Sequence, residues 1–318
     1  MVHLTNNTDY IIVLGTTYSG SGAVYDYLAG RGDLYDPLLG TEYQLPQMPN
    51  GLMALEAVAG NAFHPSTTDF VISQFKEVSK KLSQPRKIWQ YGKNYSSMLP
   101  FFEIAINQFL EEISAAKFPM NLHWHRLMQP KTPLIYFFYK LKNYLNFNNQ
   151  TPQTRIIVSQ EKFVVAAQKL HNELFKKNSI NKPVLLNQAG SGWNPIESTK
   201  FFKNRKVILV TRDPRDQFSS LKNRKKATNV EGFINWYKEL QKRIKKFENS
   251  IILKLKFEDF VNNNKKIVDN ICRHISLNSK KLSNYDPNIS KKNIGNFKKN
   301  LNQKEINTIE NELSEYLY

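Results

Sequence analysis

Residues 9–22 read DYIIVLGTTYSGSG, and this stretch decides the fold. Residues 9–14 form a continuous run of β-branched and other large apolar side chains, a pattern typical of a strand buried on both faces of a parallel sheet. Residues 15–22 are rich in glycine and serine, apolar side chains recur at helical spacing over residues 23–29, and Gly30 supplies a helix stop signal. The stretch therefore predicts a strand, a glycine-rich turn and a helix in direct succession.

Three later segments repeat the strand pattern, at residues 183–187, 206–210 and 251–256. Helical spacing separates these segments, near residues 197–203 and over residues 230–247. Because strands that alternate with helices form parallel sheets with crossovers on both faces, we predict a three-layer α/β/α fold. Its central sheet is parallel, and the fold as a whole is expected to be of the P-loop-like type.

The middle of the chain, residues 65–180, is mostly helical by pattern, with the clearest helices over residues 101–116 and 161–176. We interpret residues 1–318 as one α/β domain that carries this helical insertion. Its aromatic and basic side chains suggest either a platform for a sugar or buried core positions. These side chains are Trp124, Arg126, Tyr136, Phe138, Tyr139 and Lys140.

The composition excludes several classes of protein. Cys272 is the single cysteine of 318 residues, which rules out a disulfide scaffold and a multi-cysteine zinc site. His123 and His125 have no acidic neighbour to complete a site, so no metal is predicted. Residues 1–9 are polar, without the apolar core of a secretory signal, and no apolar run is long enough to span a bilayer. A cytoplasmic location is expected, with peripheral membrane association left open.

The charge balance points to anionic partners. Lys and Arg number 45 against 27 Asp and Glu, so the formal net charge is +18. Such a balance suits nucleic acid, a phosphorylated cofactor, an acidic glycan or a lipid headgroup, whereas a biased codon supply would produce the same lysines without any ligand. Nucleic acid is not expected, because no recognised binding module accompanies the charge.

The glycine-rich turn has the glycine spacing of a P-loop but lacks its catalytic residues. Ser21 and Gly22 stand where a nucleotide-hydrolysing loop needs Lys and a hydroxyl residue that holds Mg²⁺. Backbone N–H groups from Tyr18 to Gly22 still open onto a helix N-terminus, which favours binding of an anion without a metal. The alternative is a tight turn whose glycines serve packing alone.

A second motif, VILVTRDPRDQFSS, occupies residues 207–220. Arg212 ends a buried strand, where a cation is costly unless an anion meets it. With Asp213 as the cap of a following helix, Ser220 lies about two turns along that helix, so Arg212 and Ser220 can converge on one phosphate group. The alternative is a structural ion pair, either Arg212 with Asp213 or Arg215 with Asp216.

Together the two motifs resemble those of sulfotransferases that use 3′-phosphoadenosine 5′-phosphosulfate (PAPS). Ser19-Gly20-Ser21 matches the centre of the family's first loop, and Arg212 with Ser220 matches the later Arg and Ser at the same spacing. SKKNIGNF at residues 290–297 is similar to the family's C-terminal basic-glycine loop, and LKFEDF at residues 255–260 to its strand with Tyr-Glu-Asp-Leu. The resemblance covers residues 9–45 and 183–318.

The resemblance implies a set of donor-binding residues. The first loop would grip the 5′-phosphosulfate through Thr17, Tyr18, Ser19, Gly20, Ser21 and Gly22. The 3′-phosphate would be held by Arg212, Ser220, Lys291, Lys292, Asn293 and Gly295. The implied product is adenosine 3′,5′-bisphosphate (PAP), and no metal takes part.

One position departs from the family pattern. Tyr18 stands where most of these enzymes carry Lys or Arg beside the bridging oxygen of the leaving phosphate. A tyrosine hydroxyl donates a hydrogen bond but carries no charge, so another cation is expected to neutralise the charge that develops there. Lys291, Lys292 and Arg31 are the candidates by motif position.

Two residues are candidates for the general base. Glu42 follows Tyr18 by 24 residues, just past an expected second strand, and heparan-type sulfotransferases carry a catalytic Glu at a similar distance. The hydroxyl-directed cytosolic type uses a His farther along, for which His64 is the candidate. The alternatives are a solvated turn carboxylate after Gly40 and a turn histidine before Pro65.

The predicted function is transfer of a sulfuryl group from PAPS to a hydroxyl or amine of an acceptor, expected to be a carbohydrate. Attack would be in line, without a covalent enzyme intermediate. Two alternatives stay open. The first is a catalytically silent relative that binds nucleotide or glycan, and the second is a P-loop kinase acting on a small molecule.

Overall fold

The computed structural model describes residues 9–61, 64–119, 133–134, 137–138, 141, 153–175, 182–262 and 264–318. The chain divides into two compact units. The first unit comprises Met1–Gln47 and Phe175–Tyr318, and the second comprises Met48–Leu174. A single domain with an insertion at residues 65–180 stays a prediction.

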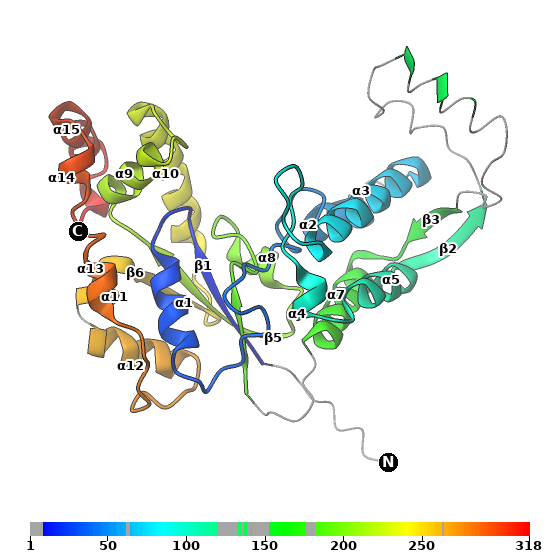
Figure 1. Ribbon diagram of the computed structural model, residues 1–318, viewed down its shortest axis with the longest axis horizontal. Helices are drawn as coiled ribbons and strands as arrows, with labels where there is room; N and C mark the ends of the chain where they lie inside the picture. Colours follow the sequence, from blue (N-terminus) through cyan, green and yellow to red (C-terminus); the bar gives the residue numbers. More distant parts are fainter. Residues whose placement is uncertain are drawn as a thin grey trace. The chain divides into compact units, whose positions relative to one another are not determined.

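The first unit is built on a four-stranded sheet in the order β4-β1-β5-β6, and all its strand pairs are parallel (Figure 1). The strands are β1 (Asp9–Gly15), β4 (Val184–Asn187), β5 (Asn204–Thr211) and β6 (Ile252–Lys256). In register, Ile12 of the central strand β1 lies between Leu186 and Val207. All four strands overlap the segments predicted from the apolar runs, so the predicted parallel sheet is confirmed.

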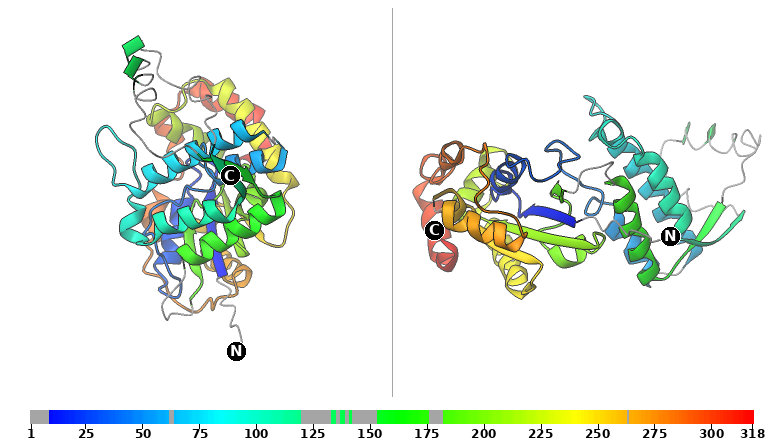
Figure 2. Two further views of the ribbon diagram at one scale, coloured as in Figure 1. Left: turned by 90° about the vertical axis from the view of Figure 1, so that its right-hand side faces the viewer. Right: turned by 90° about the horizontal axis from the view of Figure 1, so that it is seen from below.

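Helices flank this sheet (Figures 1 and 2). On one face, Ile11 and Val13 of β1 join a buried cluster with α1, α11 and α12. On the other face Tyr10 packs against Phe175 and Phe202, with ring centroids 5.1 Å apart for the Tyr10–Phe202 pair. The helices of the first unit are α1 (Ser21–Ala29), α8 (Pro195–Thr199), α9 (Pro214–Asn223), α10 (Val230–Lys246), α11 (Phe257–Asn262), α12 (Asn264–His274), α13 (Pro287–Lys291), α14 (Phe297–Asn300) and α15 (Gln303–Glu312).

A second buried cluster lies beneath α9, α10 and α15. Phe218 and Leu221 of α9 pack there against Phe233 of α10 and Ile309 of α15, and the ring of Tyr18 packs against the same cluster. A residue of the glycine-rich turn thus rests on helices that follow β5. This arrangement places the turn beside the second sequence motif.

The second unit is mostly helical in its described residues. It contains α2 (Leu52–Asn61), α3 (Pro65–Ser83), α4 (Tyr95–Met98), α5 (Phe102–Glu112), α7 (Gln160–Leu174) and an antiparallel pair, β2 (Ser114–Pro119) and β3 (Gln153–Ile157). The predicted helix over residues 101–116 is wrong at its end, because Ser114 onward pairs with β3, a partner that local spacing does not reveal. Of the expected aromatic platform Phe138 is exposed, whereas Trp124, Arg126, Tyr136, Tyr139 and Lys140 lie outside the described residues, as do His123 and His125.

The second strand expected just before Glu42 is absent. Tyr35 makes a single parallel bridge to Val184, and the chain then turns through Asp36 and Gly40, whose amide donates 2.8 Å to the Asp36 carboxylate. This turn chemistry stops the pairing after one residue. Across the described part of the chain, no helix is both long and apolar enough to cross a membrane.

Candidate functional site

The glycine-rich turn between β1 and α1 has an unusual backbone. Thr17, Tyr18 and Gly20 have positive φ angles of 63°, 53° and 82°. A Cβ on Gly20 would also clash with the ring of Phe257, so both its conformation and its surroundings require glycine. Inside the turn, the hydroxyl of Ser19 accepts a hydrogen bond from the amide of Thr16 at 3.0 Å.

Two glutamines hold the turn in this conformation. The side-chain amide of Gln217, on α9, donates to the carbonyls of Thr16 and Thr17, each at 2.6 Å. Gln188, just after β4, donates to the hydroxyl of Ser21 at 2.9 Å and accepts from the amide of Gly15 at 3.2 Å. Neither residue was predicted from the sequence, although Gln217 lies within the motif at residues 207–220.

The turn presents a row of backbone donors. Within the described residues, no hydrogen bond uses the amide N–H groups of residues 17–22. These groups precede or begin α1, whose N-terminus carries partial positive charge. Such a concave row of amides at a helix start binds phosphate or sulfate groups. The donors present therefore fit an anionic group of the kind that PAPS carries.

Arg212 lies at the end of β5, with only 6% of its surface exposed. Its guanidinium donates to the Ser220 hydroxyl at 3.1 Å, to the Tyr18 carbonyl at 3.1 Å and to the carbonyl of Asn293. The centroid of the Phe257 ring lies 5.2 Å from the guanidinium carbon of Arg212. The structure therefore brings Arg212, Ser220, the glycine-rich turn and the C-terminal segment together.

The charge of Arg212 has no direct ionic partner among the described residues. All three acceptors of its guanidinium are neutral, and its Nε is buried with no hydrogen-bond partner. Burial accordingly lowers the pKa of Arg212, against the opposing effect of nearby Asp216. A buried guanidinium of this kind is costly unless an anion meets it.

Arg215 shows the contrasting arrangement one helical turn away. Its guanidinium pairs with Asp213 at 2.7 Å and with Glu310 at 2.7 Å. Asp213 also caps α9 by accepting from the amide of Arg215 at 2.8 Å, as predicted. The structural ion pair of this motif is therefore Arg215–Asp213, a combination that neither sequence-based alternative named. Arg212, by contrast, has no carboxylate partner among the described residues.

The C-terminal segment reaches the site through its backbone. Besides the Asn293 carbonyl on Arg212, the amide of Gly295 donates to the carboxylate of Asp216 at 2.7 Å. Lys291 and Lys292 are exposed at the end of α13. The segment that resembles the family's basic-glycine loop thus lies next to Arg212.

Arg31 does not serve the glycine-rich turn. It follows α1, and a helix of nine residues is about 13 Å long. Its buried guanidinium pairs with Asp33 at 2.7 Å and donates to the carbonyl of Asn278 at 2.8 Å. Arg31 is therefore structural, which removes it from the candidates for the cation missing at Tyr18.

A pocket of about 510 Å³ opens beside the turn. Aromatic side chains of Tyr18, Phe233 and Trp236 line it together with polar groups of Thr228 and Asn229. The remaining lining residues are Thr17, Leu221, Lys226, Ala227 and Gly232. Because Thr17 and Tyr18 belong to both, the pocket and the row of amide donors share the same turn.

The two candidate bases are placed differently. Glu42 is half-buried in the first unit and accepts from the Gln44 side chain at 2.9 Å. The amide of Tyr43, its neighbour, donates to the carbonyl of Asn187 at the end of β4 at 2.8 Å. Glu42 thus lies near the carboxyl edge of the sheet even without a strand before it. His64 is exposed and precedes α3 in the second unit.

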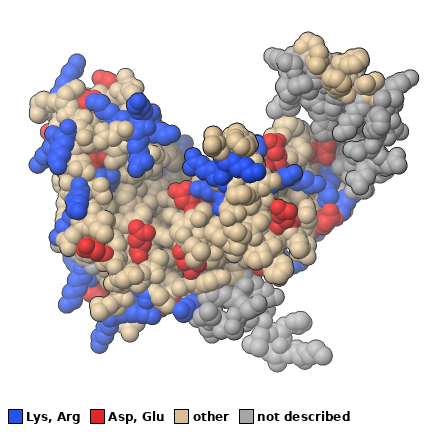
Figure 3. Space-filling view, viewed as in Figure 1, with Lys and Arg blue, Asp and Glu red and all other residues tan. Residues whose placement is uncertain are grey.

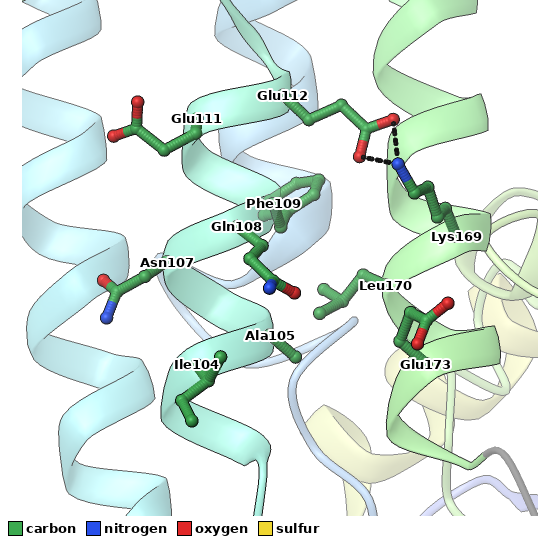
Figure 4. A pocket seen from close by; sticks show the side chains of 10 residues that line it. All are labelled: Ile104, Ala105, Asn107, Gln108, Phe109, Glu111, Glu112, Lys169, Leu170 and Glu173. Carbon is green, nitrogen blue, oxygen red and sulfur yellow. Dashed lines mark hydrogen bonds and ion pairs between the residues drawn. The ribbon is translucent and has the colours of Figure 1, made fainter.

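A larger hollow, of about 880 Å³, lies within the second unit between α5 and α7 (Figure 4). Its lining includes Glu111, Glu112 and Glu173, and Lys169 pairs with Glu112 at 3.1 Å. Arg155 pairs with Glu111 at 2.8 Å, so cations balance much of this carboxylate charge. None of the site residues predicted from the sequence lines this hollow.

Basic side chains surround the site in the first unit. Figure 3 shows Lys and Arg gathered over the part that carries α9, α10 and α15. Exposed lysines near the site include Lys225, Lys226, Lys291, Lys292, Lys298 and Lys299. Such a surface raises the local concentration of anions. Within the described residues, no cluster of three or more His, Cys, Asp or Glu side chains forms a candidate metal site.

Comparison with known proteins finds a family model that matches part of the chain. Residues 146–280 match the model of the Sulfotransferase family. No curated protein matches the chain. Among solved structures, the chain is similar to the sulfotransferase domain from the curacin biosynthetic pathway (TM-score 0.45, 12% identity, 98% of this chain and 99% of that one).

Two further structures are similar at comparable identity. One is the sulfotransferase domain from the Synechococcus PCC 7002 olefin synthase (TM-score 0.41, 13% identity, 90% of this chain and 83% of that one). The other is a sulfotransferase from Alicyclobacillus acidocaldarius (TM-score 0.34, 10% identity, 92% of each chain). The matched segment 146–280 contains both Arg212 and Ser220. Through that segment, the chain is similar to the sulfotransferase family.

Proposed function

We propose that the enzyme transfers a sulfuryl group from PAPS to a hydroxyl group of a carbohydrate acceptor. The observation that carries this proposal is the buried guanidinium of Arg212, which bonds Ser220 at 3.1 Å but has no carboxylate partner among the described residues. A second phosphate, as in PAPS, would satisfy this cation. Cytoplasmic location and the absence of a nucleic-acid partner stay predictions.

A doubly phosphorylated donor requires two anion positions, and the free amides of the turn and the buried guanidinium of Arg212 support such an arrangement. The free amides of residues 17–22 would hold the 5′-phosphosulfate, and Arg212 with Ser220 would hold the 3′-phosphate. Lys291, Lys292, Asn293 and Gly295 would close over the latter. Bound PAPS would supply an activated sulfuryl group, and the chain would bind, orient and shield it from water.

The pocket beside the turn suits a sugar ring. The half-buried ring of Trp236 would offer an aromatic face to the C–H face of a pyranose. Thr228 and Asn229 supply hydrogen-bonding groups for its hydroxyls. Glu42 would accept the proton of the attacking hydroxyl, because it lies near the sheet edge that carries the turn.

The first experiment compares the melting temperature of the protein with PAP, ADP and ATP. A ligand at one hundred times its Kd adds about 2.7 kcal/mol to the free energy of unfolding. We expect PAP to stabilise the protein most. Preference for ATP with Mg²⁺ would instead indicate a small-molecule kinase.

The second experiment measures transfer from labelled PAPS to a panel of glycans and to amine-bearing controls. Labelled glycan is the expected product. PAP binding without transfer to any acceptor would indicate a catalytically silent relative.

A further inference from the structure

Tyr18 leaves the proposed active site without a cation beside the leaving phosphate. In the transfer step, the acceptor oxygen forms a bond to sulfur while the bond from sulfur to the bridging oxygen breaks. The electron pair of that bond stays on the bridging oxygen of the 5′-phosphate, and the acceptor proton passes to the base. The new negative charge needs a nearby cation, and the hydroxyl of Tyr18 carries no charge.

Arg224 lies over this tyrosine. Its guanidinium carbon is 5.4 Å from the centroid of the Tyr18 ring, a distance typical of a cation–π contact. The ring in turn rests on the buried cluster that contains Phe218 and Phe233, and the Tyr18 carbonyl accepts from Arg212 at 3.1 Å. Tyr18 is therefore a firmly held platform with one arginine at its backbone and another at its ring.

The charge of Arg224 is not balanced by a carboxylate of the described residues. Within the described residues Arg224 makes no ion pair and no hydrogen bond through its side chain, in contrast to Arg31, Arg155 and Arg215. Arg224 immediately follows α9 at its C-terminal end, where the helix dipole favours a cation. Its side chain is exposed, so it can adjust its position toward a ligand.

We propose that Arg224, stacked on Tyr18, supplies the positive charge that stabilises the leaving 5′-phosphate, in place of a basic residue within the loop. This inference rests on the proposed function and deepens it. The ring of Tyr18 would then position a cation that follows the C-terminal end of α9. Lys291 and Lys292 are left for the 3′-phosphate.

The test measures binding as well as turnover. The ligands are PAP, which carries a 5′-phosphate, and adenosine 3′-phosphate, which lacks it. We expect Arg224→Gln to weaken PAP about tenfold, because a charge-assisted contact is lost, and to leave adenosine 3′-phosphate within about twofold. Turnover with PAPS should fall about 10²-fold or more. Arg273→Gln, an exposed arginine of α12, is the charge-matched control and should change neither.

A rescue experiment separates the charge from the fold. Tyr18→Lys in the Arg224→Gln background places a cation in the loop itself and should restore both PAP affinity and turnover. Tyr18→Leu removes the stacking platform and should mimic Arg224→Gln. Melting temperatures of all variants without ligand show whether the fold is intact. We expect Arg224→Gln to match the wild type closely, because within the described part of the chain the Arg224 side chain makes no hydrogen bond or ion pair.

Each outcome is decisive. If the wild type binds PAP and Arg224→Gln binds it equally well, the role of Arg224 is wrong while the proposed function stands. If Lys226→Gln instead produces the selective loss of PAP, the cation is Lys226 and the proposal for Arg224 falls. If the wild type does not bind PAP, the proposed function itself is wrong.

Discussion

The carboxylate of Asp216 on α9 accepts a hydrogen bond from the amide of Gly295 at 2.7 Å and a second from the amide of Phe297 at 3.0 Å. Asp216 is 1% exposed, and burial raises its pKa. Through these two contacts, the residue ties the C-terminal segment to the helix that also carries Ser220. Asp216 is therefore a positioning residue for the proposed 3′-phosphate site.

Replacement of Asp216 should loosen the C-terminal segment. We expect Asp216→Ala to lower the free energy of unfolding by about 2–3 kcal/mol, because two amides lose a charged acceptor. PAP affinity should fall while affinity for adenosine 5′-phosphate is retained. Asp216→Asn keeps one acceptor oxygen and should recover part of both losses. Equal weakening of the two nucleotides would show that Asp216 only supports the fold.

Arg212 and Arg215 form a matched pair for a second test. Arg212→Gln should weaken PAP by about 10- to 150-fold, and adenosine 5′-phosphate far less, because a charge-assisted contact to the 3′-phosphate is lost. Arg215→Gln breaks the ion pairs to Asp213 and Glu310 and should lower the melting temperature instead. The checks are calorimetric titration and thermal unfolding. The reverse pattern would assign the phosphate to Arg215.

Gly20 and Gly22 should respond oppositely to a methyl group. Gly20→Ala forces alanine to a φ of 82° and its Cβ against the Phe257 ring, so we expect a loss of about 2 kcal/mol or more in stability. Gly22→Ala adds a Cβ that meets no atom within 4 Å in the first turn of α1. It should leave stability unchanged or raise it by about 0.5 kcal/mol. Urea unfolding of both variants measures the difference, and equal effects would contradict this turn geometry.

Glu42→Gln tests the general base. The substitution keeps the shape of the side chain and removes its basicity, so transfer should fall by about 10²–10⁴-fold with PAP affinity nearly unchanged. Single-turnover rates and PAP titrations provide the two readouts. Full activity would show that Glu42 is not the general base and would leave His64 as the candidate. Loss of PAP binding would show that Glu42 supports the loop near β4.

His274 is expected to make the free energy of unfolding fall at acidic pH. Its Nε2 lies 3.2 Å from the carbonyls of both Val207 and Ile251, and burial lowers its pKa below the ordinary value of 6.5. Because the unfolded chain then binds a proton more readily, this residue's contribution to stability is present above pH 6.5 and is lost as the pH falls through the lowered pKa. His274→Gln should flatten the decline of unfolding free energy over this range. An unchanged pH slope would contradict the assignment.

Local patterns were enough to predict the sheet and the principal motifs. The apolar runs at residues 9–14 and 206–210 form strands because a continuous apolar run can bury all of its side chains in a parallel sheet that is covered on both faces. Asp213 caps α9 as predicted, since the cap depends on an amide only two residues away. The spacing from Arg212 to Ser220 likewise follows from helical geometry over a short span.

Contacts between distant parts of the chain were decided only in the tertiary structure. The brace from Gln217 to Thr16 spans 201 residues, and the contact of Arg212 with Asn293 spans 81. Which arginine is neutralised by carboxylates depends in part on where α15 brings Glu310. The contact of Arg224 with the Tyr18 ring depends equally on the packing of α9 against the turn. Hydrogen bonds and ion pairs act over a few ångströms, so they depend on which elements pack together rather than on residue spacing along the chain.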